Sequence, residues 1–178
     1  MINNIVKFFF VGLVSGNILL SNLVAQVGNA TENLKTQANR MQSALLKGDY
    51  HTFAHYISPM ILGSMGGEAK MARELSKSAD DMKAKGMRVS RVTFDAPSKL
   101  VKSGKEWQAT MVQHTEVKGP GGRDVSTSTM IAVSEDNGVN WTFVDASDMP
   151  MDMIKKMLPN LSSALVIKPM QPAVHYNN

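Results

Sequence analysis

One aspartate in the second half of the chain is the strongest candidate for acid–base chemistry. Asp145 follows Trp141 and Phe143 at alternate positions of a strand-like pattern. An aspartate among apolar neighbours can have a raised pKa and transfer protons. Tyr50 and Tyr56 are available as hydrogen-bond donors, and no periodicity places a second acid nearby. We favour the alternative that Asp145 caps the turn before the following helix.

The histidines offer weaker chemistry. His51 and His55 are four residues apart, a spacing that can hold a metal ion on one helix face. The residues between them lack the glutamate of the zinc-protease motif, and no third ligand can be predicted, so we expect no metal site. His114 falls opposite Thr127 in the predicted strands, where an exposed, inert histidine is favoured. Serine-hydrolase and phosphate-loop motifs are absent from the sequence, and we expect no cofactor.

The composition narrows the class of protein. The chain has 178 residues, of which 43% are hydrophobic, as expected for one domain plus a targeting segment. It has no cysteine, which excludes disulfides, thiol nucleophiles and cysteine-bound zinc. The net charge of +4 is mild and the basic residues are scattered, which predicts a solvated surface and no nucleic-acid partner. The 14 methionines favour an irregular core or an adaptable apolar pocket.

The N-terminus resembles a secretory signal. A short start with Lys7 precedes an apolar run that ends in small residues, so we expect cleavage after Ala25, with Ala30 as the other candidate. The alternative is a retained membrane anchor, but polar residues interrupt the run and no basic cluster follows it. We therefore expect a periplasmic or secreted protein, with no membrane association once the signal is removed.

The mature chain divides into a helical and a strand-rich half, which predicts an α+β fold. Thr31 is expected to cap a helix that Gly48 ends, and Asp49 to cap a second. Ser58-Pro59 begins one further turn, and the third helix ends at Gly86. A final short helix, with Met151, Ile154 and Leu158 inward, follows the strands. The predicted strands cover 87–95, 99–102, 105–118, 123–136 and 139–146. Turns are predicted at 103–104, 119–122 and 137–138.

The turns fix the strand register. A two-residue turn at Asn137-Gly138 places Ala132 opposite Phe143, and a four-residue loop at 119–122 places Met111 opposite Met130. Side chains then alternate between two faces. The first face, which should meet the helices, carries Trp107, Ala109, Met111, Gln113, Met130, Ala132, Trp141, Phe143 and Asp145. The second carries Thr110, Val112, His114, Val125, Thr127, Thr129, Ile131, Val133, Thr142 and Val144. The second face is a candidate surface for a homodimer, or an ordinary open sheet face.

The order of elements and several short motifs resemble the nuclear transport factor two-like superfamily, which includes ketosteroid isomerases and SnoaL-type cyclases. The resemblance implies a cystatin-like cone, in which a curved antiparallel sheet of four to six strands wraps around three N-terminal helices and encloses a pocket. The small strand that relatives have between the second and third helices is not evident. The matching motifs are Ala44–Tyr50, Phe53, Ile57–Pro59 and Asn140–Asp145, and the end, 158–161 and 165–169, is similar to exported bacterial members.

These observations predict a signal peptide at 1–25, one domain at 26–167 and an extended tail at 168–178. The domain is expected to be non-catalytic and to bind a small apolar or amphipathic ligand, or a protein partner, in the cone. The alternative is a cofactor-free isomerase or cyclase that uses Asp145. The expected pocket wall consists of Tyr50, Tyr56, Trp107, Met111, Met130, Trp141 and Phe143.

Overall fold

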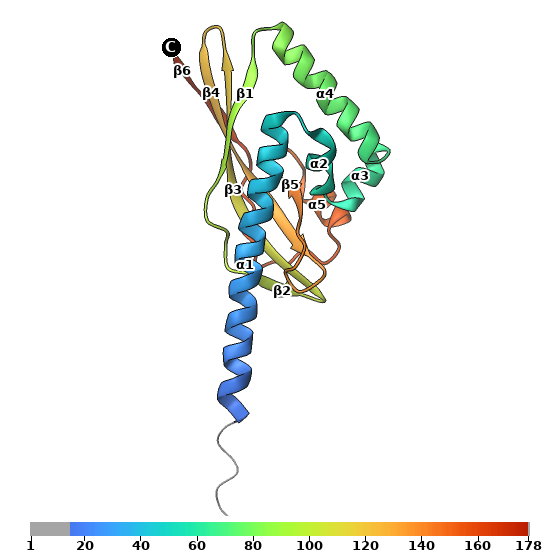
Figure 1. Ribbon diagram of the computed structural model, residues 1–178, viewed down its shortest axis with the longest axis vertical. Coiled ribbons are helices and arrows are strands. Elements are labelled where there is room, and N and C mark those ends of the chain that lie inside the picture. The colour runs from blue at the N-terminus through green and yellow to red at the C-terminus, as the bar shows by residue number, and fades with distance from the viewer. Residues whose placement is uncertain (1–14, 178) are drawn as a thin grey trace, which may run out of the picture.

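The computed structural model describes residues 15–177, with side chains from residue 26 onward. Most of the expected signal segment, at 1–14, and the last residue of the expected tail lie outside the described residues. The described part is an α+β fold, as predicted, with one antiparallel sheet (Figure 1). Its helices are α1 (Ser15–Lys47), α2 (Tyr50–His55), α3 (Pro59–Met65), α4 (Glu68–Ala84) and α5 (Met151–Met157).

The long helix α1 lies along the sheet and continues as a projecting rod toward the N-terminus (Figure 1). Its buried side chains lie on one stripe: Ala30, Leu34, Ala38, Met41 and Ala44. The prediction that Thr31 begins this helix is wrong, because the helix runs through that position. None of the helices in residues 15–177 combines the length and apolarity needed to cross a bilayer.

Thr31 has a different role from the expected cap. Its hydroxyl donates a hydrogen bond to the Val27 carbonyl, 3.0 Å away and one turn earlier in α1. A threonine hydroxyl inside a helix commonly makes this bond, whereas a cap needs a free first turn. Thr31 therefore resembles a helix cap in the sequence, although its hydroxyl is hydrogen-bonded within the helix.

The short helices that follow are closer to expectation. Asp49 caps α2, because its carboxylate accepts a hydrogen bond from the Thr52 backbone N–H. The single turn expected after Ser58 is instead the seven-residue helix α3. Between α2 and α3 the chain forms one parallel bridge, Ile57 to Phe143, which ties the helical layer to the last strand before α5.

Six strands form the sheet. They are β1 (Arg88–Phe94), β2 (Val101–Ser103), β3 (Glu106–Gly119), β4 (Gly122–Ser134), β5 (Thr142–Asp145) and β6 (Gln171–Asn177). The order is β1-β3-β4-β5, with β2 also paired to β3 and β6 also paired to β4. The two long central strands therefore join all the others into one unclosed sheet.

The predicted register is confirmed. Met111 pairs with Met130, His114 with Thr127 and Ala132 with Phe143. The loop at 119–122 is tighter than expected, because Gly119 pairs with Gly122 and leaves a two-residue turn. One additional residue pair at the end of the ladder shortens the loop and leaves the register of the strands unchanged.

Both tryptophans lie in one core, as the alternation predicted. This first core lies between α1, α2, α4 and the first face of the sheet, and Phe143 at its centre is fully buried. The buried members of this core are Ala30, Leu34, Ala38, Met41, Ala54, Ile57, Met71, Trp107, Ala109, Met111, Met130, Ala132, Trp141 and Phe143.

The second face is not open along its whole length. Its Ile131, Val133 and Val144 form a second core with Ile154 and Leu158, from α5 and the chain just after it. Half of the face proposed for a homodimer is therefore covered by the chain itself. The partly buried side chains around this core are Ile61, Met149, Met157, Leu161, Leu165 and Ile167. The expectation that Met151 points inward is wrong, since it is 45% exposed.

The C-terminal stretch 168–178, expected to be an extended tail, contains strand β6. All its described side chains are exposed, so backbone pairing with β4 carries most of its attachment. Gly122 of β4 permits this pairing, because a Cβ atom there would collide with the Tyr176 carbonyl. The backbone of Gly122 also has a φ of 144°, which side chains disfavour.

Replacing this glycine should release the last strand. We expect Gly122→Ala to raise amide hydrogen exchange across 171–177, while the rest of the sheet keeps its protection. Gly121→Ala is the matched control, since a Cβ there meets nothing within 4 Å. Equal exchange in the two variants would contradict the close approach of β6 to Gly122.

Candidate functional site

The expected pocket wall is part of the first core. Trp141 and Phe143 are 2% and 0% exposed and pack against α1, together with Met111 and Met130. Tyr56 is half-buried against the same cluster. These side chains occupy the space between helices and sheet in which the ligand was expected.

Trp107 stands apart from the other expected wall residues. Its indole Nε1 is buried and has no hydrogen-bond partner among the described residues. An unpaired buried donor costs about 1–3 kcal/mol. The Lys102 ammonium lies 5.7 Å from the centre of the ring and makes a cation–π contact. The contact offsets part of this cost without satisfying the N–H.

Asp145 lies outside the first core, although Trp141 and Phe143 are within it. It is exposed, and its carboxylate accepts hydrogen bonds from the Ser147 backbone and hydroxyl at 3.1 and 2.7 Å. Ser128 approaches the other oxygen at 3.5 Å. This geometry is that of a cap on the turn after β5.

The two helical histidines do not converge on a metal site. Both are exposed; His51 Nδ1 lies 3.7 Å from Glu68, and His55 makes an edge contact with the Tyr56 ring. Within residues 15–177 there is no group of three or more potential metal-binding side chains.

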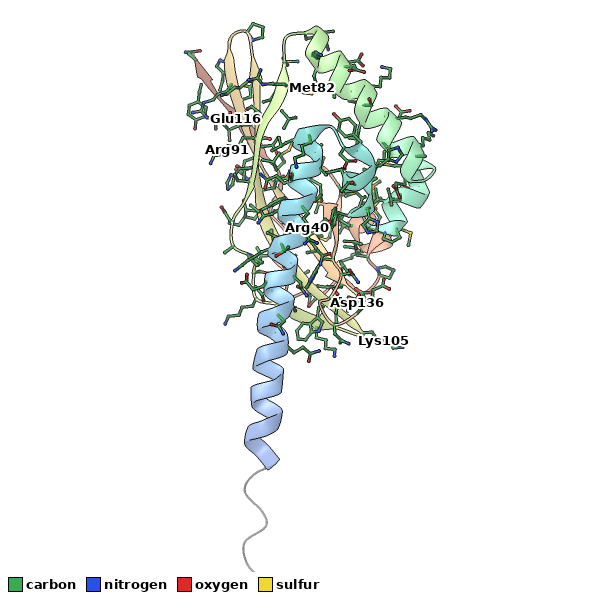
Figure 2. All side chains as sticks on the ribbon, viewed as in Figure 1. Arg40, Met82, Arg91, Lys105, Glu116 and Asp136 are labelled. Atoms are coloured by element: carbon green, nitrogen blue, oxygen red, sulfur yellow. The ribbon has the colours of Figure 1, made fainter. Side chains whose placement is uncertain are left out.

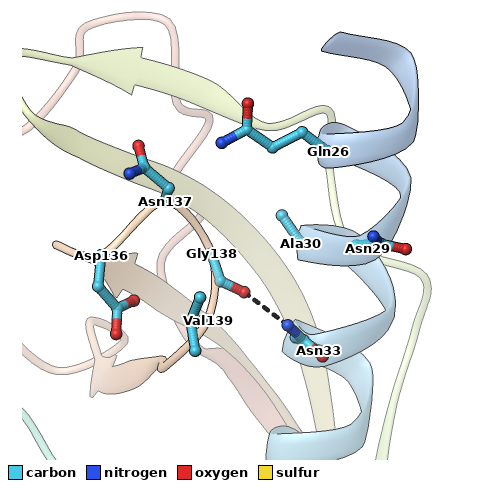
Figure 3. A pocket seen from close by; sticks show the side chains of 8 residues that line it. All are labelled: Gln26, Asn29, Ala30, Asn33, Asp136, Asn137, Gly138 and Val139. Carbon is cyan, nitrogen blue, oxygen red and sulfur yellow. Dashed lines mark hydrogen bonds between the residues drawn. The ribbon is translucent and has the colours of Figure 1, made fainter. Parts of the chain in front are cut away.

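A cleft of about 510 Å³ lies between α1 and the turn that joins β4 to β5 (Figure 3). Its volume is in the range of small-molecule sites. Gln26 extends from α1 toward Asn137, and Ala30, one turn further along the helix, faces Gly138 (Figure 3). The cleft is lined mainly by carboxamides and small apolar groups: Gln26, Asn29, Ala30, Asn33, Asp136, Asn137, Gly138 and Val139.

Side chains of α1 hold the turn in place. Asn33 donates to the Gly138 carbonyl at 3.0 Å, and Gln37 donates to the Val139 carbonyl at 2.8 Å. Gln37 also accepts from the Trp141 backbone N–H at 2.9 Å. The second half of the turn is thereby fixed to the helix, which preorganises this wall of the cleft.

The turn is also fixed internally. The Asp136 carboxylate accepts from the backbone and side chain of Asn140 and from the Ser134 hydroxyl. Burial alone would raise the pKa of Asp136, but these hydrogen bonds outweigh it and hold the pKa below its ordinary value. Because the pKa of Asp136 is lowered in the folded state, its ionised form stabilises the fold at pH values above its ordinary pKa. This contribution is lost as the pH falls through the folded pKa.

Gly138 lies directly against Ala30 of α1. Asn137 and Gly138 have φ values of 61° and 84°, as predicted for this turn. A Cβ at Gly138 would collide with the Ala30 Cβ and lie 2.9 Å from its Cα. Glycine is thus needed at position 138 for both its backbone conformation and its lack of a side chain.

A second, smaller cleft of about 250 Å³ lies between α1 and the end of β1. It is the only one of the two clefts that includes an expected wall residue, Met111. Its lining is Lys35, Asn39, Phe94, Asp95, Ala96 and Met111.

Asp95 also begins a hydrogen-bonded chain on the second face of the sheet. His114 Nε2 lies 3.2 Å from the Asp95 carboxylate, and Nδ1 lies 3.2 Å from the Thr127 hydroxyl. The sequence predicted that His114 faces Thr127 but missed Asp95, which follows the neighbouring strand. A chain of acid, histidine and hydroxyl can activate the hydroxyl as a nucleophile. Such a site also needs N–H groups that bind the oxyanion, and central strands already use theirs in the β-ladder.

The described residues therefore define a class: an α+β domain with an unclosed six-stranded antiparallel sheet, a filled helix–sheet core and a preorganised cleft beside its long helix. No family model, curated protein or solved structure matches the chain.

The contact beneath the cleft can be tested by adding a methyl group. We expect Gly138→Ala to lower the free energy of unfolding by about 1–3 kcal/mol more than Gly104→Ala, as measured by urea denaturation, because the added methyl group overpacks the contact with Ala30. Gly104 has a φ of 60° but open space around its Cβ, so it controls for backbone strain alone. Equal losses of stability in the two variants would indicate that a methyl group at position 138 does not collide with Ala30 of α1.

Proposed function

We propose that this chain is an exported, non-catalytic binding domain whose ligand occupies the cleft between α1 and the 136–139 turn. The observation that carries the proposal is the preorganised cleft, held by Asn33 and Gln37. A binding site gains affinity when its walls need no ordering on association. The proposal keeps the ligand-binding function expected from the sequence but moves the site from the core to the surface.

The lining indicates the chemistry of the ligand. The carboxamides of Gln26, Asn29 and Asn137 offer both donors and acceptors, and Ala30 and Val139 offer apolar contact. Asp136, the one carboxylate in the lining, already accepts three hydrogen bonds. The best-suited ligand is small, uncharged and amphipathic, with hydroxyl or amide groups.

Catalysis has less support than binding. Asp145 is exposed and caps a turn, and it lines neither cleft. The expected acid–base role needs a carboxyl group in apolar surroundings, whereas Asp145 is hydrogen-bonded at the surface. The isomerase alternative therefore lacks the apolar pocket that its chemistry requires.

A bulky side chain in the cleft should remove a bound ligand. We expect native mass spectrometry of the chain purified from its host to detect a retained small molecule, and Val139→Trp to abolish its retention. Val139 is 58% exposed in the cleft wall, and Val166, 67% exposed outside it, provides the control Val166→Trp. A wild-type chain with no ligand, or equal retention in both variants, would argue against the cleft.

Export is part of the same proposal, and the burial of Ala30 favours one of the two cleavage sites. Ala30 is 1% exposed and packs against Gly138. Cleavage after Ala30 would remove this contact, together with Gln26 and Asn29 of the cleft wall. Cleavage after Ala25 keeps all three residues.

The intact mass of the exported protein tests this choice. We expect a chain that begins at Gln26, because only that product keeps the described contacts of α1 with the turn. A mass that begins at Thr31 would contradict the structural argument, and a full-length mass would contradict processing.

Membership of the nuclear transport factor two-like superfamily also remains a proposal. The order of helices before a meander of strands supports it. The parallel bridge at Ile57 adds support, since it falls where the sequence lacked the small strand of relatives. A cone that encloses a ligand is less well supported, because packed side chains occupy the space between α1 and the sheet.

A further inference from the structure

Three cations stand side by side on the second face of the sheet. Arg88 of β1 pairs with Lys118 of β3, which pairs with Arg123 of β4. Directly paired residues point to the same face, and neighbouring strands are about 4.8 Å apart. The three side chains therefore form one row across the sheet. We call Arg88, Arg91, Lys118 and Arg123 the basic row.

Among the described residues, one carboxylate lies within the basic row. Glu116 pairs with Arg91, and Figure 2 places both at the same end of the sheet. Glu116 accepts hydrogen bonds from the Ser90 hydroxyl at 2.6 Å and from Arg123 at 2.9 Å, and Lys118 is 3.8 Å away. The Ser90 hydrogen bond, together with Arg123, holds the pKa of Glu116 below its ordinary value.

The positive charge of the basic row exceeds what its one carboxylate neutralises. Like charges directly opposite each other destabilise a sheet. One carboxylate against four cations leaves a surplus of three, and Arg88 and Arg91 are exposed with no ion pair within the described residues. An anionic partner that covers the row would offset this cost.

The row lies on the open half of the second face. The α5 helix covers the other half, around Ile131 and Val144. Beside the row, β6 exposes Val174 and Tyr176, which are 53% and 44% exposed. Arg123 lies 4.3 Å over the Tyr176 ring and links the basic row to this apolar strip.

We propose that the basic row and the adjoining β6 strip dock this protein on an anionic lipid surface. Basic side chains beside an exposed tyrosine suit the headgroup region of a bilayer, where each cation gains about 1 kcal/mol.

A second copy would bring the same sign of charge against the row. A single-stranded nucleic acid would need free aromatic faces, and Arg123 covers the Tyr176 ring. The proposal departs from the sequence-based expectation of no membrane contact and is independent of the cleft.

The test measures co-sedimentation of the full chain with vesicles. Phosphatidylcholine alone is compared with an equal mixture of phosphatidylcholine and phosphatidylglycerol. The preference for the mixture should fall on the order of 100-fold in R88Q/R91Q/K118Q, since three cations are lost. The matched control K47Q/K70Q/K105Q removes the same charge from exposed sites elsewhere and should keep most of the preference.

A site-specific measurement separates docking by the row from binding by the N-terminal apolar segment. Spin-labelled phosphatidylglycerol should broaden the NMR signals of Val174, Tyr176 and Lys118 first. Broadening elsewhere, equal loss of preference in both triple variants, or no preference for the anionic vesicles would overturn the proposal. Removal of the chain from the vesicles by polyglutamate or duplex DNA at equal charge would also overturn it, by indicating a general polyanion site.

Discussion

The ladder between β3 and β4 is the constraint on which the other features depend. These two strands pair without interruption from Trp107–Ser134 to Gly119–Gly122. Because side chains alternate, a slip of one residue would move Met111 and Met130 out of the core. The same register brings Lys118 beside Arg123 and His114 beside Thr127. The apolar core, the basic row and the histidine chain thus follow from one set of backbone hydrogen bonds.

Much of this ladder could be predicted because its ends are marked by turns that need special residues. Asn137 and Gly138 adopt the positive φ values that the hairpin requires, and the glycines at 119 and 122 close the other end. Helix α1 was harder to delimit, since Thr31 resembles a cap and is satisfied within the helix instead. The cover of α5 over the second face also escaped prediction, because alternation within a strand does not reveal which distant segment packs on it.

The expected binding residues illustrate the same limit. The inward orientation of those on the strands was predictable from period two. Whether inward side chains enclose a cavity depends on how helices fill the space, which no local pattern encodes. Trp141 and Phe143 pack against α1. The cleft lies instead between α1 and a turn more than a hundred positions away in the chain, which Asn33 and Gln37 hold in place. The carboxamides of α1, at 26, 29, 33 and 37, follow one helix face, but the sequence does not show which distant turn that face meets.

The burial of both tryptophans in one core gives the molecule an intrinsic optical reporter. Trp107 and Trp141 lie in the same cluster between α1 and the sheet, and each is well shielded from water. Their fluorescence therefore reports on the contact between helix and sheet. The open half of the second face has no indole, so events on it would leave this emission nearly unchanged. Trp141 Nε1 donates to the Gly138 carbonyl, which makes that ring sensitive to the turn as well.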